Sequence, residues 1–171
     1  MTIALAGRRI DAPGSETPRF PVENVPMVRQ RIRAMLASHK PNALVCSAAC
    51  GADLLALSET GAIGRRRRAI LPFERERFRE TSVMDRPGDW GPLYDTILDE
   101  VECVVLTGKG EGPEAYAATN LAIFDEAEKI GTEVMAVLVW DGSSRGSDDQ
   151  TAGFGDEARR RGLAVIEIST L

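Results

Sequence analysis

The sequence has few of the residues that build metal centres and disulfide frameworks. It contains three cysteines and one histidine among 171 residues. Three cysteines cannot all pair, and a zinc site of the usual Cys/His type needs four such ligands. We therefore expect no metal, no cofactor and no disulfide framework. A reduced, cytoplasmic setting is the default for such a chain.

Long apolar stretches and a positive net charge are also missing. No window approaches the roughly 20 apolar residues of a membrane-spanning helix. The opening MTIALAGRR lacks the charged start and long apolar run of a signal peptide. The formal net charge is −5, which disfavours non-specific binding to nucleic acid or an acidic membrane. Neither a membrane nor a nucleic acid is an expected partner.

One basic cluster runs against this net charge. Arg65–Arg68 is followed by further arginines, which alternate with acidic residues: Arg75, Arg77 and Arg79 with Glu74, Glu76 and Glu80. We expect the first half to precede a strand, away from the strand carboxyl ends. A solvated face is the preferred interpretation, with a nucleic-acid patch as the alternative.

Two common phosphate-binding motifs are absent. The chain has no GxxxxGK[ST] and no GxGxxG, and Gly108-Lys109-Gly110 is too short to be either. Ordinary ATPase and dehydrogenase functions are therefore disfavoured. A Cys–His nucleophile is improbable as well, because His39 is expected at a helix end far from Cys50.

What the sequence does contain is an alternation of short apolar runs with helical segments. The candidate strands are Ile3–Ala6, Ala43–Ser47, Ala69–Leu71, Cys103–Leu106, Val134–Val139 and Ala164–Ile168. The candidate helices are one carrying Val25, Val28, Ile32, Met35 and Leu36, one following Asp53, and Glu74–Ser82, Gly91–Glu100, Pro113–Ile130 and Phe154–Arg161. Nearly continuous apolar runs are typical of parallel strands covered on both faces.

This alternation predicts one Rossmann-like α/β domain over residues 1–171. Its sheet is expected to be doubly wound and mainly parallel, with about six strands and helices on both faces. Cys46 and Cys103 fall in predicted core strands, and Gly142–Gln150 is expected to be a mobile loop.

In such a sheet, ligands bind beyond the carboxyl ends of the strands. The residues expected there are Gly7, Arg8, Arg9, Ser47, Ala48, Gly51, Asp53, Thr107, Gly108 and Asp141. Small residues permit close backbone approach, and a helix N-terminus offers N–H groups to an anion. The positive charge needed to bind a phosphate could come from Arg8, Arg9, Arg19 and Lys109. Asp53 or Asp141 could accept hydrogen bonds from ribose hydroxyls.

Each of these features also has a purely structural interpretation. Small residues between a strand and a helix can serve packing alone, and Asp53 is favourable in a first helical turn whatever it binds. Tyr116 and Asn120 share a helical stripe with apolar residues and should point inward near the strand ends. Asn120 is then either a satisfied core amide or a ligand contact.

The turn Ser47-Ala48-Ala49-Cys50-Gly51-Ala52-Asp53 resembles the second-strand motif of the SLOG superfamily. These Rossmann-like proteins include phosphoribohydrolases, DNA-processing proteins and sensor domains. The stretches AGRRIDAPGSETPRFP, LPFERERFRETSV and VWDG are similar to a bacterial subgroup. The resemblance implies a nucleotide-like ligand held by Gly7, Arg8, Ser47, Ala48, Gly51 and Asp53, with Thr107 and Gly108 opposite.

The resemblance does not extend to the catalytic motif of the phosphoribohydrolases, PGGxGTxxE, which is absent. The preferred hypothesis is therefore binding or sensing of a nucleotide-like small molecule, which would need a partner or a homo-oligomer to transmit a signal. The alternative is a nucleoside-monophosphate N-glycoside hydrolase, using Asp141 or Glu114 as its acid. A third interpretation is a fold used only for protein contacts.

Overall fold

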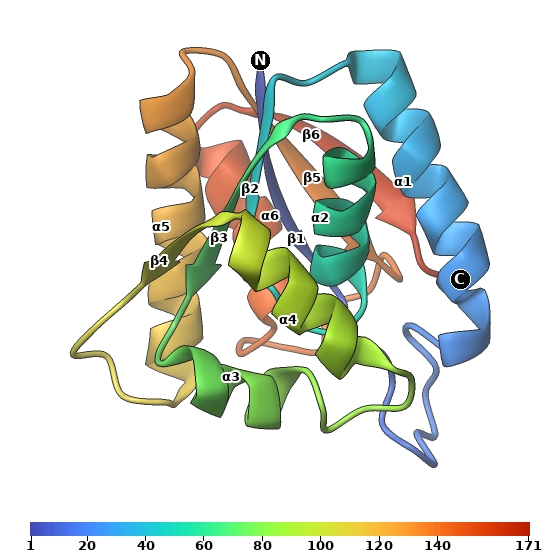
Figure 1. The fold of residues 1–171 in the computed structure, drawn as a ribbon. Coiled ribbons are helices and arrows are strands. Elements are labelled where there is room, and N and C mark those ends of the chain that lie inside the picture. The colour runs from blue at the N-terminus through green and yellow to red at the C-terminus, as the bar shows by residue number, and fades with distance from the viewer.

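The computed structural model describes residues 1–171 and contains one six-stranded sheet (Figure 1). Its strands are β1 (Thr2–Gly7), β2 (Ala43–Cys46), β3 (Arg66–Leu71), β4 (Glu102–Val105), β5 (Val134–Trp140) and β6 (Ala164–Ser169). They lie in the order β4-β3-β2-β1-β5-β6, and every neighbouring pair is parallel. The predicted doubly wound parallel sheet is confirmed.

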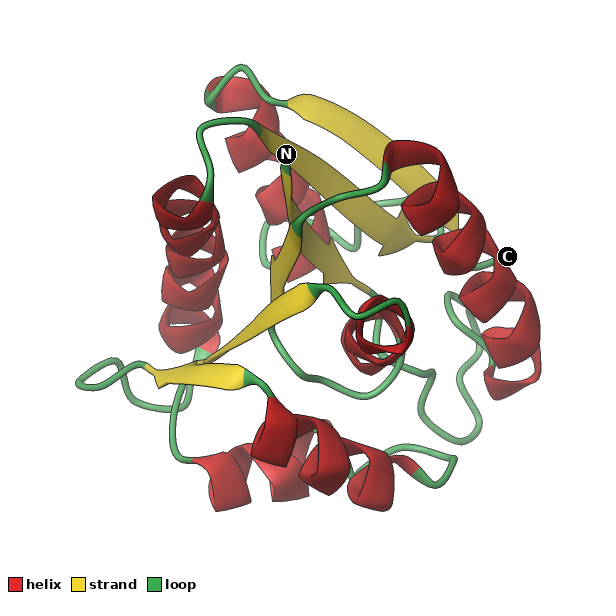
Figure 2. Ribbon diagram, turned by 45° about the horizontal axis from the view of Figure 1, so that its top comes forward, coloured by secondary structure: helices red, strands yellow, loops and turns green.

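Helices cover both faces of this sheet (Figures 1 and 2). One face carries α1 (Val25–His39), which follows the short η1 (Val22–Asn24), together with α2 (Ala52–Ala62) and α4 (Trp90–Glu100). The other face carries α5 (Pro113–Ile130) and α6 (Gln150–Arg160). The remaining helix, α3 (Arg75–Ser82), lies near the end of the sheet where the strands finish.

The core lies in two layers, one on each side of the sheet. The larger cluster has 31 buried residues and joins α1, α2 and α4 to the strands, whereas the smaller one has 11 and lies under α5 and α6. In the smaller layer Phe124 of α5 stacks on Phe154 of α6, with ring centroids 4.2 Å apart. Buried aromatic pairs of this kind hold the two helices in register and fix α5 beside the strand ends.

The chain reverses its direction of travel across the sheet between β1 and β5. From β1 it moves outward through β2 and β3 to β4, then returns to pair β5 with the free side of β1. The connections that leave β1 and β5 therefore run to opposite faces. Such a reversal opens a crevice at the carboxyl ends of the two strands, where open α/β sheets bind ligands.

The arginine run preceding Ala69 forms part of β3, so the prediction that it precedes the strand is wrong. Arg66 and Arg68 pair with Glu102 of β4, and hydrogen bonds from both arginines lower the pKa of Glu102 to about 2. Arg67 reaches Glu100. Cross-strand ion pairs allow these polar residues to extend the strand. Arg65 and Arg66 are exposed, and the charges of Arg66, Arg67 and Arg68 are paired with carboxylates.

Two further expectations are corrected at the ends of elements. Cys103 is exposed, because β4 is an edge strand with only β3 beside it. Helix α6 begins at Gln150, not Phe154, because the Asp149 side chain accepts hydrogen bonds from the N–H groups of Thr151 and Ala152. An aspartate in this position satisfies donors that a helix start leaves free.

The small residues at the start of α2 serve close packing against the end of β1. Gly51 has φ +97°, and a Cβ placed there would lie 2.8 Å from the carbonyl oxygen of Arg8. A Cβ on Gly7 would lie 2.3 Å from the Cβ of Ala52. Glycine at both positions lets the turn contact the backbone that follows β1. At Gly51 the structure therefore accounts for the missing side chain through protein contacts.

Replacing Gly51 by alanine is expected to destabilise the protein by about 2 kcal/mol, through left-handed backbone strain and a clash with the backbone after β1. Gly146→Ala is the matched control, because Gly146 has φ +112° and no atom near its missing side chain. Urea unfolding measures the loss of stability in both variants. The difference between the two losses gives the cost of the clash with Arg8, since the backbone strain is common to both. Equal losses would show that the contact with Arg8 contributes nothing.

No helix in the structure has both the length and the apolar character needed to cross a membrane.

Candidate functional site

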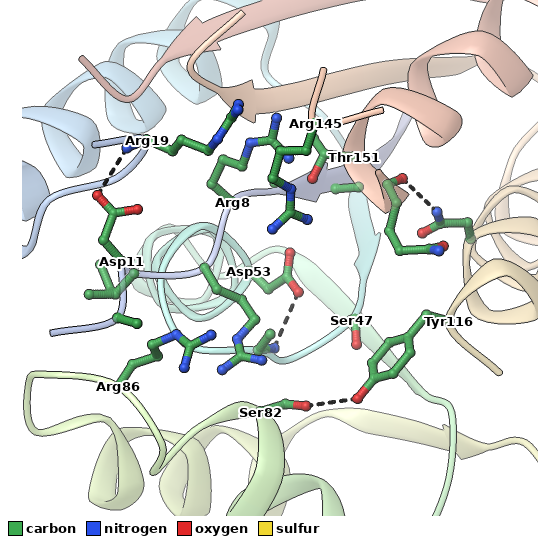
Figure 3. A pocket seen from close by; sticks show the side chains of 18 of the residues that line it. Arg8, Asp11, Arg19, Ser47, Asp53, Ser82, Arg86, Tyr116, Arg145 and Thr151 are labelled. Atoms are coloured by element: carbon green, nitrogen blue, oxygen red, sulfur yellow. Dashed lines mark hydrogen bonds between the residues drawn. The ribbon is translucent and has the colours of Figure 1, made fainter. Parts of the chain in front are cut away.

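A cavity of about 670 Å³ lies at the carboxyl edge of the sheet (Figure 3). Its walls come from the end of β1 and the loop after it, the turn before α2, α5, and the segment between β5 and α6. The loop after β1 and the segment after β5 are the connections that diverge at the reversal between these strands. The volume suits a ligand of nucleotide size.

Arginine dominates the charge of this cavity. Five arginines and three carboxylates line it, which gives a formal charge of +2 in a chain whose net charge is −5. They are Arg8, Arg9, Arg19, Arg86 and Arg145, with Asp11, Glu16 and Asp53. Asp85, Asp141 and Asp149 lie outside the lining and pair with four of these arginines, so the fifth, Arg145, is the main free cation that the cavity offers an anion.

Arg8 is the most deeply buried of the five arginines, with 3% of its side chain exposed. Its Nε donates to Asp141 Oδ1 and its Nη1 to Asp149 Oδ1, both at 2.7 Å, while its Nη2 donates to the Ser143 carbonyl oxygen at 2.6 Å. Burial opposes ionisation of Asp149, but Arg8 and nearby backbone N–H groups hold its pKa well below the usual range. Arg8 therefore ties β1 to the loop after β5.

Asp141 belongs to the same ion-pair network and does not line the cavity. Its Oδ2 accepts from Arg19 Nη1 at 2.7 Å, and only 5% of its side chain is exposed. Both carboxylate oxygens of Asp141 are thus engaged by arginine. The arrangement is a structural clasp, in which two buried carboxylates neutralise Arg8 and anchor Arg19 at the rim.

Three further arginines line the cavity, and Arg145 is the most exposed and least paired of them. Arg145 is 54% exposed, and its one ion pair is a 3.6 Å contact with Asp149. Arg9 and Arg86 share Asp85, and the buried side of the Arg9 guanidinium lies against Cys50. Guanidinium groups of this kind can present paired donors to a phosphate or carboxylate.

Asp53 is the one buried carboxylate that faces the cavity. Its Oδ2 accepts from the Ala49 N–H at 3.2 Å, its Oδ1 has no hydrogen-bond partner, and the residue is 6% exposed. Burial raises the pKa of Asp53 to about 7, against the opposing effects of the Ala49 N–H and the charge of Arg9. Figure 3 shows Asp53 near the middle of the cavity, with Arg145 pointing toward it.

The wall opposite the exposed arginines is aromatic and uncharged. The Tyr116 hydroxyl lies 3.2 Å from Ser82 Oγ, and its ring meets Phe73 edge-on. Asn120 donates to the Gln150 carbonyl oxygen at 2.8 Å. Asn120 is thus satisfied within the protein, while Tyr116 offers part of its ring to the cavity.

A short loop forms the outer rim. Asp11 Oδ2 accepts from the backbone N–H groups of Arg19 and Phe20, which brings together the two ends of the exposed segment 12–18. Ser15, Glu16 and Thr17 of this segment line the cavity. Asp11 therefore holds the rim in place and is not free to bind a ligand through Oδ2.

The predicted site residues divide into two groups. Those that line the cavity are Gly7, Arg8, Arg9, Ser47, Asp53, Tyr116 and Asn120. Those outside its lining are Ala48, Gly51, Thr107, Gly108 and Asp141, together with Lys109. Ala48 and Gly51 are buried in the turn, and Asp141 is held by arginines. No group of three or more His, Cys, Asp or Glu side chains is arranged to hold a metal ion.

Sequence reasoning missed two arginines that give the cavity its charge. Arg145 follows β5, so the rule about strand carboxyl ends includes it once the reversal beside β1 is known. Arg86 comes from the segment after α3, where nothing in the sequence signals that it faces the cavity. Ser82 and Thr119 were also missed, at helix positions where a small hydroxyl is ordinary.

Comparisons with known proteins show a distant structural likeness. No protein family profile matches the chain, and no curated protein matches it. Among solved structures, DNA processing protein A (DprA) from Streptococcus pneumoniae is similar at 16% identity and a TM-score of 0.43. The alignment covers 96% of this chain and 58% of that protein, so the chain spans less than two thirds of the length of DprA.

Proposed function

We propose that this protein binds a nucleotide or nucleotide-derived anionic small molecule in the cavity at the carboxyl edge of its sheet. The observation that carries the proposal is the concentration of five arginines in one cavity of an acidic chain. The cavity lies where the order of strands reverses, which is where open α/β sheets bind ligands. Its volume and aromatic wall fit a molecule with a charged end and a flat end.

Membership of the SLOG superfamily, as one domain over residues 1–171, is part of the same proposal. The turn Ser47–Asp53 carries the resemblance, and within it Ser47 and Asp53 face the cavity while Gly51 serves packing. A sensor of this kind passes ligand binding to a second protein or to another copy of itself.

The direct test is a thermal-shift screen of the purified protein. The probes are ribonucleoside 5′-monophosphates, cyclic nucleotides and ADP-ribose, with inorganic phosphate as the reference anion. A ligand that binds only the folded state raises Tm by mass action. We expect at least one nucleotide to raise Tm more than phosphate does at equal concentration. No shift from any nucleotide would overturn the proposal.

The alternative hydrolase function is tested by chromatography. Each sample in which a nucleotide raises Tm is analysed for free base. The hydrolase's two candidate acids do not line the cavity: Asp141 is held between Arg8 and Arg19, and Glu114 is exposed on the first turn of α5. A general acid must reach the leaving group directly or through one water. We therefore expect binding without release of free base.

Arg145→Ala is expected to weaken binding of the best nucleotide about tenfold, the usual cost of losing a hydrogen bond to a charged group. Stability should change little, because Arg145 is half exposed and makes one long ion pair. Arg160→Ala is the control, since Arg160 is 71% exposed on α6 and outside the cavity. Isothermal calorimetry measures both variants. Equal affinities for the two would remove Arg145 from the site.

A further inference from the structure

Three kinds of side chain follow one another across the cavity. In Figure 3, Arg19 and Arg86 lie on one side, Tyr116 on the other, and Asp53 between them. The arginine side presents cationic donors, and the Tyr116 side presents aromatic and apolar surface from Tyr116, Phe78 and Ile123. The order is therefore an arginine-rich wall that also holds Asp11, then the Asp53 carboxylate with Arg145 beside it, then an aromatic wall.

The free carboxylate oxygen of Asp53 restricts what can lie in the middle. Asp53 Oδ1 is buried without a hydrogen-bond partner, and Asp53 makes no ion pair, although Arg145 points toward it. A buried acceptor without a partner costs free energy, so a ligand gains by supplying a donor there. A phosphate monoester, with its second pKa at about 6, is mostly dianionic at neutral pH, so it offers few protons and is repelled by an ionised carboxylate. A neutral donor such as a hydroxyl fits this position without charge repulsion.

A ribonucleotide presents its groups in this same order. Its phosphate fits the arginines, its ribose carries two hydroxyl donors, and its base has a flat face for an aromatic wall. Building on the proposed nucleotide binding, we propose that the cavity selects ribonucleotides over deoxyribonucleotides through a hydrogen bond from a ribose hydroxyl to Asp53 Oδ1. Asp53 thereby acts as the specificity determinant of the site.

The test compares each ribonucleoside 5′-monophosphate with its 2′-deoxy and 3′-deoxy forms by calorimetry. We expect at least one deoxy form to bind about 10-fold to 100-fold more weakly, the effect of one hydrogen bond to a charged acceptor. Equal binding of all three forms would overturn the role of Asp53 while leaving nucleotide binding intact. Absence of binding by any form would overturn the proposed function, and the selectivity with it.

Asp53→Asn identifies the residue responsible. Its amide oxygen can still accept from the Ala49 N–H, while the charged acceptor facing the cavity is lost. We expect the preference for ribose to fall below about threefold, with affinity for the deoxy form retained. Glu114→Gln is the control, because it removes an exposed carboxylate of α5 that lies outside the cavity lining. Selectivity preserved in Asp53→Asn would overturn the assignment.

The number of protons released or taken up on ligand binding gives a second test. A purely structural role of Asp53 would leave this number unchanged. A hydroxyl donated to Asp53 stabilises the carboxylate, so binding near pH 7 should release a fraction of a proton in the wild type. Titrations in buffers of different ionisation enthalpy measure this number, and Asp53→Asn should reduce it. Proton uptake would mean that Asp53 donates to an anion, contrary to the proposal. The charges facing Asp53 are those of Arg9 and Arg145, which stay protonated throughout.

Discussion

Replacing Arg8 by methionine is expected to lower the free energy of unfolding by about 3–5 kcal/mol at neutral pH. Arg8 compensates two carboxylates that have almost no contact with solvent, those of Asp141 and Asp149. Methionine fills a similar volume but supplies no donor. Asp149 then keeps only backbone donors and its long contact with Arg145, and Asp141 keeps only Arg19. The cost comes from buried charge left without a partner, more than from the loss of an attraction.

Urea unfolding measures the stability lost in Arg8→Met. Two further variants identify the cause of the loss. Arg66→Met removes an arginine from an ion pair whose partners are each about half exposed, and should cost less than about 1 kcal/mol. Adding Asp149→Asn to Arg8→Met should recover part of the loss, because it neutralises one orphaned charge. A loss for Arg8→Met no larger than that for Arg66→Met would show that the clasp contributes little to stability.

Asp53→Asn is expected to gain stability relative to the wild type as pH rises, by about 2–3 kcal/mol between pH 5 and pH 8. The unfolded chain releases the Asp53 proton near the ordinary pKa of 3.8, whereas the folded protein keeps it until about pH 7. Between these values the folded state holds more protons than the unfolded state. The wild type therefore loses stability with rising pH through this group, and asparagine does not titrate.

Thermal or urea unfolding at several pH values measures the difference between the two proteins, which cancels the other titrating groups. Asp148→Asn is a suitable control, because Asp148 is exposed and its replacement should leave the profile unchanged. A constant difference between Asp53→Asn and wild type across the range would contradict the raised pKa. The expected gain in stability alongside lost ribose selectivity is a familiar conflict at binding sites.

The sheet could be predicted from the sequence because apolar runs identify strands that are covered on both faces. Helix α5 was predicted with its observed bounds, from Pro113 to Ile130, because proline and glycine mark its ends. The start of β3 could not be predicted in this way. Arg66 and Arg68 extend the strand beside β2, and their charges are paired there by Glu102, more than 30 residues later in the chain.

The candidate site was predictable only in part, for a related reason. Gly7, Ser47 and Asp53 follow strand ends directly, so their approximate location follows from the sheet alone. The role of Arg8 depends on Asp141 and Asp149, which lie 133 and 141 residues further along the chain. Composition and spacing carry no information about such pairs. Whether an arginine at a strand end is free for a ligand is decided by the tertiary partners that it meets.

The position of β1 in the middle of the sheet has a consequence for synthesis on the ribosome. Residues Thr2–Ala6 are all buried, and one side of β1 pairs only with β5, which emerges more than 120 residues later. Until then a nascent sheet of β1, β2, β3 and β4 leaves β1 as an apolar edge strand, open to pairing with other chains. Arg8 has neither carboxylate partner during that interval. The centre of the finished sheet is thus exposed until the last third of the chain arrives.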